Sequence, residues 1–317
     1  METTPWGELA AVGAAMIWAG TSIIFTHAGK RATPLAANTF KTVLGSLLFA
    51  LVLTIREGVP YGRGIAPFDW GMLALSGVVG LSLGDSLLFK GFVILGTRRA
   101  MLVFSLNPVI GAVAGYLFLG ERLGWKAILG MAVALAGVAL VIGEKRPPAP
   151  DGLTPPPDPT PLRPGRGSLI ARHVTLFGIL FALGGGFGQA IGAILAKSSL
   201  QRVDTLPATA IRMSAASLGL VILGLVTGKL HHWTRLIIQG RLAARMALAS
   251  FFGPFLGVYL MVLSLDLAPT GVALTLLATS PIWLLPLGAW FQGDRPSKRE
   301  AIGAFVALAG VALLMLR

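Results

Sequence analysis

The sequence predicts an all-α polytopic membrane protein with ten transmembrane helices, arranged as two inverted five-helix repeats. Two observations predict this fold class, an apolar composition and an internal repetition. Residues of the AVILMFWYC set make up 55% of the 317 residues and charged residues only 12%, with a mean hydropathy of +0.78. A soluble domain carries about twice that charged fraction. The octet VALAGVAL occurs twice, at 133–140 and at 306–313.

The apolar residues fall into blocks of about 20, the length at which a helix crosses about 30 Å of hydrocarbon. The predicted spans are 6–28, 35–55, 70–94, 98–119 and 125–143, followed by 174–199, 207–227, 242–266, 270–291 and 299–316. The N-terminal stretch METTPWGE is acidic and lacks the basic region of a cleaved signal peptide. We therefore expect the first block to remain in the protein as a span.

A proline-rich stretch, RPPAPDGLTPPPDPTPLRPGRG, separates the two sets of spans. Each proline removes a backbone donor and clashes with the preceding turn, so this density does not support a helix. We expect an extended, solvated linker rather than a ligand for a partner domain. The predicted organisation is a first repeat at 1–145, a flexible linker at 146–172 and a second repeat at 173–317.

The two sets of spans match at a single offset of 173 positions (306 − 133), without a gap from about Ala74 to the end. Pro108 falls on Pro281 and Arg122 on Arg295 at this offset. Leu- and Val-rich helices can coincide by composition alone, but prolines and arginines rarely do so at one offset. The chain is therefore interpreted as an internal duplication.

The predicted number of spans per repeat is odd, and this parity has a mechanistic consequence. A unit with five crossings leaves the membrane on the side opposite its entry, so its copy must insert in the inverted orientation. Inverted repeats are the usual frame of secondary transporters, which bind substrate near the midplane between the halves and expose it to each side in turn.

Several short motifs recur in both halves. PLAANTFK and PATAIR place a proline before a cation at the second helix of each half. SLNPV and ATSPI lie in the fourth helices, LGERL and QGDRP follow them, and each closing helix contains GVAL. Together these motifs resemble the EamA family of the drug/metabolite transporter superfamily, which implies a ten-helix bacterial exporter of amino acids and other small metabolites. Lys41 and Asp294 depart from the arginine and glutamate that are more usual in that family, and the linker is unusually long.

Two cations lie at matched places within predicted spans. Lys41 is about 10 Å into its span by helix rise, and Arg212 occupies a similar place in the second half. Ionisable groups inside spans are costly and indicate function by default. They could bind an anionic group of the substrate or hold one conformation through a carboxylate. Alternatively, they extend to the interface and fix the depth of their helices.

Asp85 is the deepest predicted charge, near the bilayer centre, and its counterpart at the repeat offset is Val258. It is too short to reach the interface, so it must pair with a cation, be hydrated in a cavity or remain protonated. It could couple transport to protons or bind a substrate ammonium group. The alternative is a structural ion pair with Lys41, Lys90 or Arg212.

Pro108 and Pro281 interrupt the backbone hydrogen bonds of their helices and are predicted to form kinks or hinges. Asn107 and Ser280 precede them and could offer hydrogen bonds to a ligand. Further candidates for lining a cavity are Trp18, Trp283 and Gln189. The glycine run GGGFGQAIGA lies inside an apolar span, so close helix packing explains it better than a phosphate loop.

The sequence offers no cofactor or metal site. It contains no cysteine, and the HHW at 231–233 lacks further ligands at metal spacing. No phosphate-binding G-x-x-x-x-G-K-[ST] motif occurs. The net charge of +13 is assigned to short loops between spans rather than to a nucleic-acid partner.

The predicted function is a secondary transporter, not an enzyme, that exports small polar metabolites such as amino acids across the cell (inner) membrane. Its predicted partners are the small-molecule substrate, the lipid bilayer and protons or another coupling ion. Two alternatives are a membrane-embedded enzyme for lipid-linked substrates and a membrane component that transports nothing. Loop cations number seven on the side of the termini and sixteen on the other. The positive-inside rule thus places the termini outside, whereas the resemblance implies cytoplasmic termini.

Overall fold

The computed structural model describes residues 6–107, 109–110, 124–142, 167–238, 240–268, 273, 276–292 and 297–315. All regular elements in these ranges are helical. Six segments are long and apolar enough to cross a membrane: Trp6–Arg31, Pro34–Glu57, Pro67–Leu95, Val174–Leu200, Thr205–Val226 and Gly240–Leu267. They correspond to the first three predicted spans of each half. The chain is therefore a multi-pass membrane protein.

The first half contains α1 (Trp6–Arg31), α2 (Pro34–Glu57), α3 (Pro67–Ser76), the π-helix η1 (Gly77–Gly84), α4 (Asp85–Leu95), α5 (Thr97–Phe104) and α7 (Trp125–Ile142). The second contains α8 (Gly167–Leu200), α9 (Thr205–Val226), α10 (Leu230–Ile237), α11 (Gly240–Ser250), the π-helix η2 (Phe251–Gly257), α12 (Val258–Leu267), α14 (Ser280–Gln292) and α15 (Lys298–Met315). Parts of the predicted spans 98–119 and 270–291, including Pro108, lie outside the described residues.

The boundaries follow local chemistry. Thr33 caps α2 by accepting a hydrogen bond from the Ala36 amide, Pro34 occupies the first turn, and Gly58 ends the helix at φ +73°. α8 begins at Gly167, inside the stretch predicted as linker up to 172. The difference has a simple reason, because the last proline of the linker is Pro164 and the residues from Gly167 onward contain no proline to interrupt the helix.

Each half contains a π-helical segment in the middle of its third span. η1 joins α3 to α4, and η2 joins α11 to α12. The two segments occupy equivalent places at the repeat offset, and Asp85 and Val258 follow them directly. Hydropathy did not predict either segment. π-Helical turns are rare and are frequent at functional sites.

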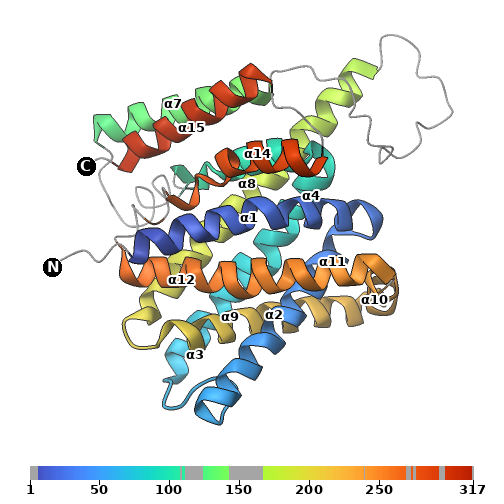
Figure 1. Ribbon diagram of the computed structural model, residues 1–317, viewed down its shortest axis with the longest axis vertical. Coiled ribbons are helices and arrows are strands. Elements are labelled where there is room, and N and C mark those ends of the chain that lie inside the picture. The colour runs from blue at the N-terminus through green and yellow to red at the C-terminus, as the bar shows by residue number, and fades with distance from the viewer. Residues whose placement is uncertain are drawn as a thin grey trace.

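The two halves pack against each other through equivalent helices (Figure 1). α1 lies along α12, and its counterpart α8 lies along η1 and α4. α2 packs on α9, and α7 packs on α15. The start of α1 and the end of α15 lie at the same end of the molecule (left in Figure 1). This pattern is that of an approximate two-fold axis between the halves.

The repeated octet is the contact between α7 and α15. A Cβ added to Gly137 would collide with the backbone of Ala307, and a Cβ added to Gly310 would collide with the backbone of Ala134. As the residue number rises on one helix it falls on the other, so the two helices are antiparallel. The octet is duplicated because each copy supplies the small residues that the other needs for close approach.

We expect Gly137→Val to destabilise the protein, because its side chain would enter the space occupied by the Ala307 backbone. Overpacking costs about 1–3 kcal/mol, and the melting temperature in detergent should fall by about 5 °C or more. Ala139→Val, on an exposed face of the same helix, is the control and should change little. Equal melting temperatures for the two variants would contradict the antiparallel contact.

Candidate functional site

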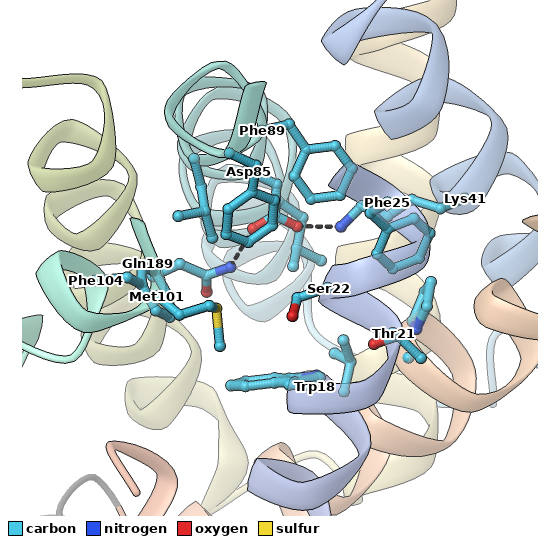
Figure 2. A pocket seen from close by; sticks show the side chains of 16 residues that line it. Trp18, Thr21, Ser22, Phe25, Lys41, Asp85, Phe89, Met101, Phe104 and Gln189 are labelled. Atoms are coloured by element: carbon cyan, nitrogen blue, oxygen red, sulfur yellow. Dashed lines mark hydrogen bonds and ion pairs between the residues drawn. The ribbon is translucent and has the colours of Figure 1, made fainter. Parts of the chain in front are cut away.

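A cavity lies between the two halves, close to the middle of the spans. It is lined by α1, α2, η1 and α4, and α5 from the first half, and by α8, η2 and α12 from the second. Its polar side chains are Thr21, Ser22, Lys41, Asp85 and Gln189 (Figure 2). The rest of the wall is mostly apolar and aromatic, including the predicted Trp18.

Lys41 and Asp85 form an ion pair at the wall of this cavity. Both residues are only 5% exposed, so Lys41 does not extend to the interface. Its ammonium group also lies over the rings of Phe89 and Phe25, at 5.0 and 5.9 Å from their centroids. Of the two interpretations of Asp85, the structure shows the geometry of an ion pair. That pair nevertheless faces a cavity rather than a closed core.

Gln189 brings the second half to the same carboxylate. Its Nε2 donates a hydrogen bond of 2.6 Å to Asp85 Oδ1, while Lys41 occupies the other oxygen. The glycine run makes this approach possible, since a Cβ on Gly188 would lie 2.8 Å from the Cα of Gly84. The run therefore packs α8 against η1 and positions Gln189 against Asp85.

Asn38 supports η1 from α2 and was not predicted. Its Nδ2 donates to the carbonyl oxygens of Leu81 and Ser82 at 3.0 and 3.1 Å, and to Ser86 Oγ at 2.8 Å. These bonds connect α2 to two carbonyl groups of η1 and to the first turn of α4. Asn38 is three residues before Lys41, so one face of α2 holds both the π-helix and the ion pair.

Arg212 has the least satisfied environment among the described charges. It is 0% exposed, and none of its three guanidinium nitrogens has a hydrogen-bond partner. Asp85 is the carboxylate whose charge attracts it. Like Lys41, it does not extend to the interface. Two cations and one carboxylate therefore share this region, and one positive charge lacks a direct partner.

The remaining predicted residues divide between two places. Asn107, Ser280 and Pro281 line a smaller adjoining cavity that shares Trp18 and Gln189 with the first. The Asn107 side-chain oxygen is buried without a partner, and Ser280 donates to the Leu277 carbonyl at 2.9 Å. Trp283 does not join them. It lines a separate groove between α1 and α14 and donates to Thr279 Oγ1 at 3.2 Å.

Two further ion pairs do not involve the side chains that line the cavity. Arg98 on α5 pairs with Glu300 on α15 at 2.8 Å, and Glu300 also caps α15 together with Ser297. Arg202 binds Asp69 through Nε and Nη2, and this hydrogen bonding raises the pKa of the Arg202 guanidinium above its usual value. Both pairs join segments distant in sequence and leave the central charges unaffected.

The two central cavities are small, at about 60 and 30 Å³. Pockets that bury a small-molecule ligand usually measure about 300–1,000 Å³, so the two cavities are small for a metabolite in the described conformation. The site has to widen before a molecule as large as an amino acid can enter.

The described residues form an all-helical bundle of apolar spans with a charged cavity between two related halves, as in a multi-pass membrane protein. Residues 5–143 and 176–316 both match the EamA-like transporter family. The chain belongs to that family.

Individual relatives match over parts of the chain. The "Probable terminal-alkyne amino-acid exporter" of Streptantibioticus cattleyicolor is 38% identical over 73 residues, which are 23% of this chain and 25% of that protein. The "Uncharacterized transporter YvbV" of Bacillus subtilis is 23% identical over 61% of this chain and 54% of its own length. The "S-adenosylmethionine/S-adenosylhomocysteine transporter" of Chlamydia trachomatis is 30% identical over 38% of this chain and 36% of its own.

The matched regions thus span about a quarter to about half of the length of these relatives. The fold has wider support. One crystal structure superposes on 97% of this chain and 95% of its own, with a TM-score of 0.65 at 16% sequence identity. This likeness concerns the fold alone.

The ion pair predicts a coupling energy between Lys41→Met and Asp85→Asn. Each single variant leaves an uncompensated buried charge, which costs about 3–5 kcal/mol. The double variant should cost clearly less than the sum of the two, as measured by the melting temperature or by unfolding in detergent. Additive losses would mean that the two side chains do not stabilise each other.

Proposed function

We propose that the protein is a secondary transporter that exports amino acids and related zwitterions by alternating access between two inverted five-helix repeats. The observation that carries this proposal is the cluster of Lys41, Asp85 and Gln189 at a cavity between the halves. A carboxylate held by both halves can respond to any movement of one half against the other. Alternating access depends on a site that responds to such movement.

The packing of the helices supports the inverted arrangement. α7 and α15 are antiparallel, and so are α1 and α12, because Gly7 approaches Ala268 while Gly257 approaches Trp18. The two π-helices lie at the same level of the repeat, beside the cavity. π-Helical segments are rare and are frequent at functional sites, and a site between two inverted halves is the usual arrangement for alternating access.

The charges indicate how an α-amino-acid group would bind. Its carboxylate would replace Asp85 at Lys41, and its ammonium group would bind the released Asp85 carboxylate. The attraction between Arg212 and Asp85 would continue during this exchange. Each charge of the substrate would thus have an opposite charge as its neighbour.

Two of the relatives are consistent with this substrate class. A terminal-alkyne amino acid and S-adenosylmethionine differ in size and side chain, but both carry an α-ammonium and an α-carboxylate group. The apolar wall formed by Trp18, Met101 and Phe104 would then receive the substrate side chain. The name of the first relative and the resemblance of the motifs support the proposed direction of export.

Transport by purified protein in liposomes tests the proposal. A panel of labelled amino acids should be taken up or released, and Asp85→Asn should lower the rate about 100-fold, because the loss of a buried charge partner costs about 2–5 kcal/mol. Asp204→Asn, on an exposed loop residue, is the control. Amines that lack the carboxylate should not be transported.

Two results would contradict the proposal: unchanged transport by both Asp85→Asn and Lys41→Ala, or equal transport of amino acids and their decarboxylated amines. The same vesicles, measured with and without a pH gradient, show whether protons drive the movement. Dependence on the gradient would identify protons as the coupling ion.

Arg212→Met separates function from stability. Removing a buried guanidinium without hydrogen-bond partners should raise the melting temperature, while transport should fall about tenfold or more because Asp85 loses its second cation. Lys41→Met is the comparison, since it should lower both the melting temperature and the rate of transport. If Arg212→Met lowered the melting temperature as much as Lys41→Met, the role of Arg212 would be structural.

A further inference from the structure

A second, larger groove runs along α1. It is lined by α1 of the first half and by α11, η2 and α14 of the second, so it lies between the two halves. Its volume is about 980 Å³, far more than that of the central cavity. Most of its lining is apolar, with Ile17, Leu248, Phe252 and Leu287 along its length.

One end of the groove is strongly basic. Lys30 from α1 and Arg245 from α11 line it together with His27. The charges of Arg31, Arg245 and Lys30 all act on the His27 imidazole, so four basic groups gather there. Among the described residues, no acidic side chain forms an ion pair with Lys30 or Arg245.

His27 adds a polar group with no partner. Its Nε2 is shielded from solvent and makes no hydrogen bond within the described chain. It lies on the groove-lining face of α1, one turn before Lys30. A ligand at this end would therefore find both positive charge and an unused hydrogen-bonding group.

We propose that this groove binds one anionic phospholipid, with its phosphate at the basic end and an acyl chain along the apolar walls. The dimensions fit this ligand. From Lys30 to Met16, the lining residues of α1 extend about 20 Å by helix rise. One leaflet contributes about 15 Å of hydrocarbon, and the headgroup region accounts for the rest.

The charge pattern selects an anionic lipid over a zwitterionic one. Basic pockets between transmembrane helices bind anionic headgroups, and each Lys or Arg near the surface adds to the attraction. A lipid in this groove would touch α1 of the first half and α11 and α14 of the second. It would thus connect the two halves, whichever solute the central cavity carries.

The test uses protein reconstituted in vesicles with equal amounts of phosphatidylglycerol and phosphatidylcholine of matched chains. After mild extraction, native mass spectrometry counts the lipids that remain bound. The wild-type protein should retain phosphatidylglycerol preferentially, and Lys30→Gln/Arg245→Gln should reduce that preference about tenfold. Lys229→Gln/Arg235→Gln removes the same charge from exposed residues near α10 and should change it less than twofold.

The apolar wall has its own control. Leu248→Gln should lower retention of phosphatidylglycerol, whereas Leu225→Gln, which is similarly exposed on α9 outside the groove, should not. Three results would overturn the proposal: no preference in the wild type, equal losses in both charge variants, or full displacement of the lipid by soluble glycerol phosphate. The last would indicate a site for free anions.

Discussion

Hydrocarbon does not solvate charge, and this constraint explains the centre of the molecule. An ionised side chain inside a span must find an opposite charge or a polar cavity. Asp85 finds both, because Lys41 of the first half and Gln189 of the second bind its two oxygens at the wall of the central cavity. The interaction that stabilises the buried carboxylate therefore also joins the two halves.

The packing around this carboxylate depends on small residues. Glycines on α8 and η1 let their backbones approach closely enough for Gln189 to reach Asp85. Asn38 then binds the carbonyl groups of η1 from the other side. Small residues also allow close packing at the periphery, where the duplicated octets bring α7 and α15 together. A closely packed frame thus surrounds the few central charges.

Much of this fold follows from the sequence, because hydrophobic blocks, prolines and a constant repeat offset are linear signals. The first three spans of each half lie within a few residues of their predicted bounds. Lys41, Asp85, Arg212 and Gln189 were candidates for a simple reason, namely that polar groups in apolar helices are conspicuous. The central cavity brings Trp18 to three of them.

Other features depend on three-dimensional packing and had no clear linear signal. The π-helices differ from α-helices by one hydrogen-bond register, which composition does not record. Asn38 stands in an ordinary stretch of α2, so its role became visible only beside η1. Trp283 was expected to line a cavity. It lines the larger groove along α1, because the direction of its side chain depends on the rotation of α14. Whether Arg212 has a partner depends on side-chain geometry alone.

The placement of the charges described above depends on the antiparallel relation of the two halves. The sequence contains no cysteine, so the orientation of each half can be measured directly with single introduced cysteines. Single cysteines at Arg63, after α2, and at His232, after α9, would each be labelled with a membrane-impermeant maleimide in sealed vesicles of known orientation. The account predicts that the two positions react from opposite sides of the membrane. Labelling of both from the same side would contradict it.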